Sequence, residues 1–554
     1  MTAAPWWTSA VIYQVYPRSF ADSNADGVGD LPGITRRLGY IADLGVDALW
    51  VSPFFHSPFK DFGYDVSDYR AVDPLFGSLS DFDALLKEAQ RLGMKVMIDQ
   101  VLAHCSDQHP WFQESASSRD NPRADWFVWR EAKPDGTEPN NWLSFFGGRA
   151  WSWSPKRRQY YHHNFLSSQP NLNYANEAVV SAIVEECRFW LERGVDGFRL
   201  DAIHTCSTAP HAGDNAARAE KSESDESDEG SDSDGATQNR GQPFAYQLQE
   251  SAQLDQPGTQ TLLRRLRQLS DQYDDIFLMG ELAGEDGMTL IDKYTAGDEK
   301  LHSCYSFDLL DWEGQNAPQI REVLARSAKA LRPGRVTFAV SNHDVPRAAS
   351  RNGNANAVPE AAQDSFAVTL TLLNLSLNGS ACLYQGEELW LPEAEVPFDA
   401  LQDPWGRAFW PEFKGRDGAR TPMPWQSDEA MAGFSSAAKS WLPIDPRHRA
   451  KAVDQQLTRP DSPLMQVRAF LAWRRDQRAL HSGELKLLEG NEKLVAFERH
   501  SAGETRLCLF NFGEAQEVEL PPGGWRRLLG EGENRGQDRF LLPAYSRVFL
   551  APER

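Results

Sequence analysis

Two carboxylates in this chain end apolar runs of strand length, where such groups can act as nucleophiles or proton donors. Asp201 closes the run GFRLD at 197–201, and Glu281 closes FLMGE at 277–281. Arg199 lies on the same side of a strand as Asp201, and its guanidinium would keep that carboxylate ionised, as a nucleophile requires. The apolar approach to Glu281 tends to raise its pKa, as a general acid needs. We therefore predict a nucleophile paired with an acid.

Two further segments have the same form. DQVLAH at 99–104 ends in His104, and FAVSNHD at 338–344 ends in His343 and Asp344. Each apolar run is typical of a buried parallel strand whose last residues emerge at one edge of a sheet. A lone Arg-x-Asp or a lone histidine is most often structural, so the inference depends on the ordered set. A (β/α)₈ barrel presents its chemistry at this edge.

Taken in order, the four segments resemble the sequence regions of the α-amylase superfamily, glycoside hydrolase family 13. The resemblance implies that Asp201 is the nucleophile, Glu281 the general acid and base, and Asp344 a third catalytic carboxylate that binds hydroxyls beside the anomeric carbon. His104 and His343 would contact sugar hydroxyls. A retaining glycosidase places its two reacting carboxyl groups about 5 to 5.5 Å apart, which neighbouring barrel strands can do.

Two more segments resemble the α-glucosidase and oligo-1,6-glucosidase branch of that family. They are DFGYDV at 61–66 and KGRDGARTPMPW at 414–425. By resemblance, Asp61 binds the terminal glucose, Tyr64 stacks on it, and Arg416 pairs with Asp61. An arginine–carboxylate pair gives a rigid, closed end to a pocket, which predicts exo action.

Three residues are expected to act on the leaving-group side. Phe165 and Phe146 lie in the excursion before the fourth strand and are candidates for lining it. In this branch the residue after the nucleophile tends to be Val in enzymes that cleave α-1,6 bonds, and here it is Ala202. Because a β-branched side chain would crowd an α-1,4 leaving group, Ala202 predicts a preference for maltose-like substrates.

The segment after the first strand, DSNADGVGD at 22–30, has the ligand spacing of an EF-hand loop without its terminal Glu. Its family counterpart binds Ca²⁺ or Mg²⁺ away from the catalytic pocket, so we expect one structural ion and no organic cofactor. The alternative is an Asp/Gly turn without metal. Ala103 and Asn171 replace family residues, which argues against a second, amylase-type calcium site. The expected ligands are Asp22, Asn24, Asp26, Val28 and Asp30.

Strand-like and helix-like runs alternate along most of the chain, which predicts an α/β fold with a parallel sheet. We expect a (β/α)₈ TIM barrel with an inserted lid domain after strand 3 and a C-terminal antiparallel β-sandwich. The expected bounds are 1–104 and 173–480 for the barrel, 105–172 for the lid domain and 481–554 for the sandwich. The acidic stretch 220–235 has no apolar residue and is expected to be a solvated loop.

Composition restricts the partners. A net charge of −22 disfavours nucleic acid and anionic membranes, so we expect a small neutral sugar as substrate. No apolar run is long enough to span a membrane, and the start lacks the pattern of a signal peptide. The six cysteines have no paired spacing, which favours buried thiols and a cytoplasmic location. The oligomeric state stays open.

The sequence thus predicts a retaining, exo-acting α-glucosidase that releases α-glucose from the non-reducing end of short α-glucosides. It would prefer α-1,4 linkages and carry out transglucosylation. One alternative is a transferase or isomerase of the same family, such as trehalose synthase or sucrose isomerase, and another is an oligo-1,6-glucosidase. A non-catalytic binding subunit of the amylase fold would have lost its carboxylates, and this chain has all three.

Overall fold

A computed structural model describes residues 4–209, 211–217, 252–283, 287–310, 313–536 and 538–553. The acidic stretch 220–235, which we expected to be a solvated loop, lies outside the described residues.

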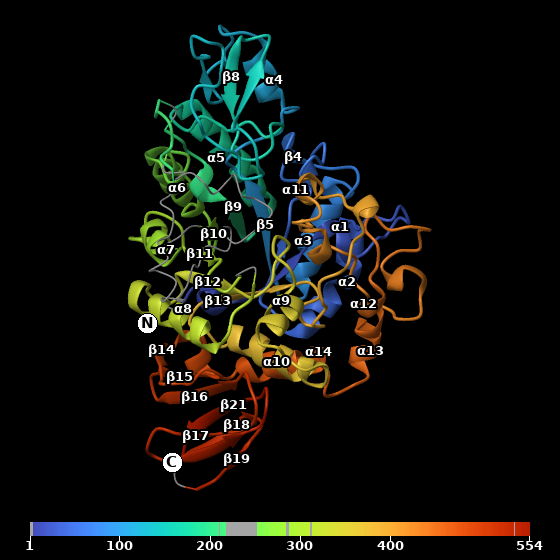
Figure 1. Cartoon of the computed structure of the whole chain (residues 1–554), viewed down its shortest axis with the longest axis vertical. Coiled ribbons are helices and arrows are strands. Elements are labelled where there is room, and N and C mark those ends of the chain that lie inside the picture. Colours follow the sequence, from blue (N-terminus) through green and yellow to red (C-terminus); the bar gives the residue numbers. More distant parts are fainter. Residues whose placement is uncertain are drawn as a thin grey trace.

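Eight parallel strands close into a barrel, as predicted, in the order β1-β13-β12-β11-β10-β9-β5-β2 (Figure 1). Almost every residue of these strands is buried, because the barrel interior and the surrounding helices cover both faces. The barrel strands are β1 (Val11–Val15), β2 (Ala48–Val51), β5 (Lys95–Val101), β9 (Gly197–Asp201), β10 (Phe277–Leu282), β11 (Ser303–Ser306), β12 (Val336–Ala339) and β13 (Ser380–Tyr384).

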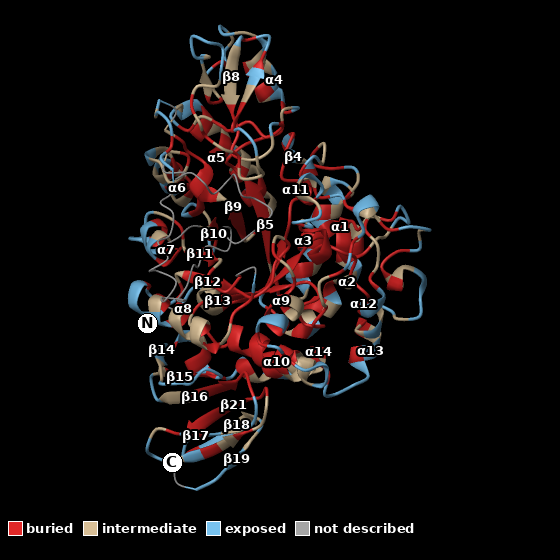
Figure 2. Ribbon diagram, in the orientation of Figure 1, coloured by how far each residue is buried: buried red, intermediate tan, exposed pale blue. Residues whose placement is uncertain are grey.

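Helices join successive strands and pack around the barrel (Figures 1 and 2). Most of them present apolar residues at helical spacing to the strands and a polar face to solvent, whereas α1 is buried throughout and α10 is buried from Phe366 to Asn374. In α3, for example, Ser78 and Asp81 form a capping box at the start. The helices are α1 (Pro17–Phe20), α2 (Leu31–Leu44), α3 (Leu79–Arg91), α5 (Glu177–Arg193), α6 (Pro257–Ser270), α7 (Gly287–Thr295), α8 (Ala317–Ala330), α9 (Ala348–Ala355) and α10 (Gln363–Asn374).

Two excursions rise from the carboxyl ends of the strands. Between β2 and α3, the short strands β3 (Phe55–His56) and β4 (Asp68–Val72) flank a loop. Between β5 and α5 lies a small antiparallel sheet in the order β6-β8-β7, at the top of Figure 1. The elements of this second excursion are α4 (Pro110–Ser117), β6 (Trp129–Arg130), β7 (Trp151–Ser154) and β8 (Gln159–His162).

After β13 the chain passes the site loops, where Arg416 contacts Asp61 and Asp403, and then returns to the outer helices and the terminal module. The helices of this segment are α11 (Pro404–Phe409), α12 (Pro446–Ala450), α13 (Val453–Leu457), α14 (Pro463–Arg474) and α15 (Arg478–Ser482). Of these, α14 packs on α2 and α10, and α15 packs on β15 (Leu494–Ser501).

The remaining strands form the predicted antiparallel terminal module, at the lower end of Figure 1. Its five-stranded sheet has the order β14-β15-β16-β21-β18, and its three-stranded sheet the order β17-β20-β19. The strands are β14 (Glu484–Leu487), β15 (Leu494–Ser501), β16 (Glu504–Asn511), β17 (Gln516–Glu519), β18 (Trp525–Gly530), β19 (Glu533–Asn534), β20 (Arg539–Leu542) and β21 (Arg547–Pro552).

The three central strands of the five-stranded sheet, β15, β16 and β21, are mostly buried on both faces. Along β15, Leu494 and Ala496 point into the core between the two sheets, whereas Val495 and Phe497 join the main core of the barrel. Phe549 of β21 packs on α14 in the same way, with its ring 5.2 Å from that of Phe470. Because strand side chains alternate, one strand serves two cores.

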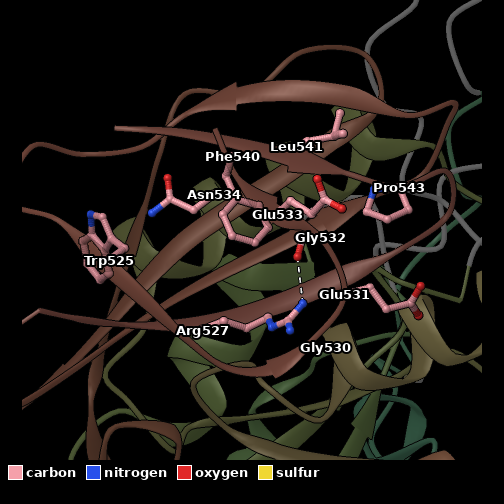
Figure 3. Close-up of a pocket in the computed structure, with 10 residues that line it drawn as sticks. All are labelled: Trp525, Arg527, Gly530, Glu531, Gly532, Glu533, Asn534, Phe540, Leu541 and Pro543. Carbon is pink, nitrogen blue, oxygen red and sulfur yellow. Dashed lines mark hydrogen bonds between the residues drawn. The ribbon is translucent and has the colours of Figure 1, made fainter. Parts of the chain in front are cut away.

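The terminal module also has an open pocket of about 680 Å³ between β18 and β19 (Figure 3). Its polar side chains have partners within the chain: the Arg527 guanidinium donates to the Gly532 carbonyl, and Glu533 pairs with Arg535. Trp525 and Phe540 belong mostly to the sandwich core. The pocket therefore leaves few groups free to bind a ligand.

The sequence predicted buried thiols and no membrane-spanning helix. All six cysteines are buried and unpaired. Among the described residues, every helix is too short or too polar to cross a membrane.

Candidate active site

The carboxyl ends of three neighbouring strands bring the predicted nucleophile and acid together. Asp99 of β5 stands in register with Arg199 of β9, and Leu200 stands in register with Gly280 of β10. Asp201 and Glu281 are the next residues on their strands, so both emerge at the same edge of the barrel.

Arg199 joins these strands through its guanidinium. Its Nη1 lies 2.7 Å from Asp201 Oδ1 and 2.8 Å from Asp99 Oδ1, and its Nη2 lies 2.5 Å from Glu281 Oε1. Arg199 and Asp99 are fully buried, and Glu281 is also buried. One cation therefore serves three carboxylates in a water-poor setting.

Burial raises the pKa of all three carboxyl groups. The pKa of Glu281 rises from the ordinary 4.5 to about 8, and that of Asp201 from 3.8 to about 7. Burial likewise raises the pKa of Asp99 to about 6. Arg199 lowers the pKa of Asp201, as expected from the sequence, but burial outweighs it. At neutral pH Glu281 is thus the group that keeps a proton, as a general acid must.

The backbone after Asp201 helps to hold Glu281. Ala202 has φ +37°, a left-handed conformation that is uncommon for a residue with a Cβ. Its N–H donates to Glu281 Oε2 at 2.8 Å. The turn continues into the short 3₁₀ helix η2 (Ile203–Thr205). Strained backbone of this kind gathers at functional sites, where neighbouring structure maintains it.

Asp344 faces the site from the loop after β12. Its Oδ1 accepts from Arg420 Nη2 at 2.8 Å and lies 3.3 Å from Arg416 Nη1, while His343 Nε2 lies 3.2 Å from Oδ2. Burial alone would raise its pKa, but His343, Arg420 and Arg416 lower it well below the usual range. Asp344 keeps 26% of its side chain exposed, against 12% for Asp201, so it is open to a ligand.

Arg416 connects Asp344 to two further carboxylates. Its Nη2 lies 2.9 Å from Asp61 Oδ1 and 2.8 Å from Asp403 Oδ1. Asp403 Oδ2 also accepts from the backbone N–H and the Nε of Arg416. The predicted pairing of Asp61 with Arg416 is therefore present, and Asp403 is an additional partner. Gln169 Nε2 donates to the other oxygen of Asp61 at 2.9 Å.

His343 lies at the centre of a buried chain of hydrogen bonds. Its Nδ1 is 2.8 Å from Gln14 Nε2, and its Nε2 is 2.5 Å from the Tyr64 hydroxyl, which donates to Asp99 Oδ2. Burial lowers the pKa of His343 to about 3, so the ring is neutral. Tyr64, expected to stack on sugar, stacks here on the His343 ring with centroids 5.5 Å apart.

His104 is buried beside the same loop. Its Nε2 is 2.9 Å from the Tyr64 carbonyl, and burial lowers its pKa to about 4. Among the described residues, its Nδ1 has no hydrogen-bond partner. Its Nε2 is also 3.1 Å from Nε2 of Gln169, the residue that donates to Asp61, so His104 is tied to the Asp61 loop.

Phe165 and Phe146, the candidates for the leaving-group side, contact each other with ring centroids 5.5 Å apart. Phe165 also contacts His104 at 5.2 Å, and Phe146 stacks on Trp405 at 5.2 Å. The Arg416 guanidinium lies 5.0 Å from the Phe146 ring. The structure thus places an aromatic wall beside Arg416.

The predicted metal loop folds as a series of tight turns. Asp22 Oδ1 accepts from the N–H of Asn24, and Asp26 Oδ1 accepts from the N–H of Val28. Asp30 is the N-cap of α2, where its Oδ1 accepts from Gly33 N. In the part of the chain that the structure describes, no group of three or more His, Cys, Asp or Glu could hold a metal ion. An ion here would depend on Asp22, Asp26, the Asn24 oxygen and the Val28 carbonyl.

Three residues of the site were not assigned from the sequence: Asp99, Asp403 and Arg420. Asp99 and Arg420 lie inside segments that the sequence analysis quoted. Asp403 precedes Pro404 and caps α11, so an Asp-Pro helix start is visible in the sequence. Its pairing with Arg416 is not, because the two meet only when the segments fold back on each other.

The chain matches the model of the alpha-amylase catalytic domain over residues 14–483, and that of a domain of unknown function over residues 487–549. A probable alpha-glucosidase of Rhizobium meliloti (strain 1021) is 48% identical over 529 residues, covering 95% of this chain and 93% of that protein. An oligo-1,6-glucosidase of Heyndrickxia coagulans is 32% identical and covers 98% of this chain and 99% of that protein.

Solved structures agree over the whole length. The crystal structure of an alpha-glucosyl transfer enzyme, XgtA, has a TM-score of 0.92 at 49% identity and covers 100% of both chains. The trehalulose synthase of Pseudomonas mesoacidophila MX-45 has a TM-score of 0.87 at 31% identity, again over 100% of both chains.

Proposed function

We propose a retaining, exo-acting α-glucosidase activity for this chain, which belongs to the α-amylase family, glycoside hydrolase family 13. Its relatives establish it as a glycoside hydrolase of the α-glucosidase branch. The observation that best supports the retaining mechanism is the Arg199 guanidinium, which contacts both Asp201 and Glu281 on adjacent strands.

In the proposed reaction, Asp201 attacks the anomeric carbon while Glu281 gives its proton to the departing oxygen. This forms a β-glucosyl ester on Asp201 and frees the aglycone. Glu281, now a carboxylate, takes a proton from water, and the resulting attack releases α-glucose. The raised pKa of Glu281 supports its first role, because a protonated carboxyl group is needed at neutral pH.

Asp344 and Asp61 would bind the hydroxyls of the glucose. Both are held by Arg416, and the cations around Asp344 keep it ionised as a strong acceptor. His104, beside the same loop, is proposed to contact a further hydroxyl. The buried Arg416–Asp61 pair closes the end of the pocket that binds the terminal glucose. A longer chain cannot extend past this end, which supports exo action on short substrates.

The linkage and the acceptor belong to this proposal as well. Ala202 favours α-1,4 substrates such as maltose, because it lacks the branched side chain that would crowd an α-1,4 leaving group. The similarity to an alpha-glucosyl transfer enzyme supports transglucosylation, in which a sugar hydroxyl replaces water in the second step.

A second candidate is an isomerase that returns glucose to its own leaving group. The similarity to a trehalulose synthase favours it, because the fold and the length of the two chains agree. The two candidates differ in the fate of the glucosyl ester and not in how it forms.

Product analysis on maltose, isomaltose and sucrose tests the proposal. We expect glucose from maltose, with the α-anomer first by proton NMR, and faster turnover of maltose than of isomaltose. A sucrose isomer as main product would favour the isomerase. Asp201→Asn and Glu281→Gln should each retain less than about a tenth of wild-type kcat, since each removes one half of the double displacement.

The loop at 22–30 is proposed to take one Ca²⁺ or Mg²⁺, on the strength of its oxygen spacing and its tight turns. No organic cofactor is required, because carboxyl groups fill both chemical roles. The six buried thiols support a reducing, cytoplasmic setting.

A further inference from the structure

Arg18 is a buried arginine whose side chain has no ion pair or hydrogen bond to any described residue. It lies in α1, just after β1, and keeps only 7% of its surface exposed. The Nε atom of Arg18 is buried without a hydrogen-bond partner, and burial lowers the pKa of the guanidinium. A desolvated cation is costly unless its surroundings stabilise it in another way.

Four aromatic rings surround the guanidinium instead. Its Cζ lies 4.5 Å from the ring centroid of Phe59, 5.3 Å from Phe62, 5.7 Å from Phe76 and 5.3 Å from Trp441. All four distances are within the range of cation–π attraction, which is strongest where water is excluded. The rings, together with the negative charges of Asp73, Asp65 and Asp26 nearby, stabilise the buried cation.

Two of these rings flank Asp61 in the chain. Phe59 has φ +58° and Phe62 has φ +50°, left-handed conformations that are strained for bulky residues. Between them, the N–H groups of Lys60 and Asp61 both donate to the Asp65 carboxylate. Strained residues persist only where surrounding contacts fix them, and Arg18 contacts both.

We propose that Arg18 is a positioning residue for Asp61, which it holds in place by binding the Phe59 and Phe62 rings on either side. Arg18 does not touch Asp61 and acts through the backbone of that loop. The inference rests on the proposed function, because it takes Asp61 to bind the terminal glucose. It adds a determinant on α1, outside the carboxylates and arginines of the site.

The test is the inhibition constant for glucose, which reports binding at the Asp61 end. Arg18→Met keeps an apolar side chain of similar length and removes the cation. We expect the constant and the KM for maltose to rise about five- to tenfold, with a smaller change in kcat, because Asp61 contacts the sugar away from the bond that breaks. A merely structural role would lower the melting temperature without raising the inhibition constant.

Arg37→Met is the matched control. The Arg37 guanidinium also lies on an aromatic ring, 4.3 Å from that of Trp425, but it contacts no part of the Asp61 loop. Its inhibition constant should stay within about twofold of wild type. Arg18→Lys keeps the charge without the flat guanidinium, so it should give an intermediate value.

The outcomes separate the two ideas. An unchanged constant in folded Arg18→Met, or an equal rise in Arg37→Met, overturns the inference while the proposed function stands. A wild type that neither hydrolyses maltose nor binds glucose overturns both. If Arg18→Met is not recovered folded, Phe62→Leu removes one ring from the guanidinium, and a constant below about twice that of wild type would refute the proposal.

Discussion

The guanidinium of Arg199 touches three carboxylates, and this sharing assigns different roles to chemically similar groups. A single positive charge cannot balance three buried negative charges, so at least one carboxyl group holds a proton. Burial raises the pKa of Glu281 to about 8, the highest of the three, so the proton resides there. Two carboxyl groups bound by one arginine can thus act as an acid and a nucleophile.

The pH dependence of activity should follow from this arrangement. Both pKa values are raised, so kcat/KM for maltose should fall below about pH 7, where Asp201 becomes protonated, and above about pH 8, where Glu281 loses its proton. The two limbs belong to the coupled pair. Initial rates across the pH range check this. An acid limb at the ordinary carboxyl value would contradict it.

Asp403 should matter for activity although it lies behind Arg416. Asp403→Asn weakens the grip on Arg416, which aligns both Asp61 and Asp344, so we expect kcat/KM for maltose to fall about 10- to 100-fold. Asp445→Asn is a matched control, because Asp445 also caps a helix and pairs with an arginine, Arg447, on the outer surface. An equal loss in both variants would point to general destabilisation.

Ala202→Val should move the linkage preference towards isomaltose. Added methyl groups beside Asp201 crowd an α-1,4 leaving group and change the ratio of kcat/KM values by about 10- to 100-fold. Because the position has φ +37°, a β-branched residue is also strained there, so overall activity should fall. Ala202→Ser separates size from branching. A Val variant with an unchanged ratio would show that the linkage is read elsewhere.

At the scale of elements, the loop at 22–30 between α1 and α2 offers the clearest test. If it binds Ca²⁺ or Mg²⁺, a chelator should lower the melting temperature by about 2 to 5 °C, and added metal should restore it. Asp26→Asn keeps an acceptor for the Val28 N–H but removes a charge, so the variant should respond less. A melting temperature that does not change when chelator is added would favour a turn without metal.

The elements themselves could be read from the sequence, because apolar runs and helical spacing record burial directly. The runs that end in Asp201 and Glu281 are barrel strands, and the alternating segments after 483 are antiparallel strands. Contacts between distant segments leave no such record in residue spacing, and the Asp61–Arg416 pair was predicted only through the family resemblance. The Asp403–Arg416 pair, the left-handed Ala202 and the rings around Arg18 follow from how loops fold back on one another.

At the scale of the whole molecule, Arg499 ties the terminal module to the barrel. It is fully buried on β15, and its Nη1 donates to the carbonyls of Ser376 and Leu377 beyond α10, while its Nη2 donates to that of Gly483. These carbonyls would be buried without a donor if the guanidinium were removed.

Arg499→Met should therefore destabilise the whole chain by about 3 to 5 kcal/mol while leaving the kcat of folded enzyme unchanged. Calorimetry should give one lowered transition, because the sheet shares its core with the barrel. Arg526→Met, an exposed change on the same module, should melt like wild type. Two separate transitions would mean that the module folds independently.

The strand order of the terminal module also bears on how the chain is made. β14 and β15 each pair with the next strand to be synthesised, but β16 and β18 both pair with β21, which lies between them in the sheet and is made last. The ribosome delivers β18 first, so its backbone must wait for β21, on the order of seconds at ordinary rates of translation. During that interval both β16 and β18 present open edges, and the apolar faces of α10 and α14 lack their cover. Until β21 is in place, these open edges and apolar faces can pair with those of another copy of the chain.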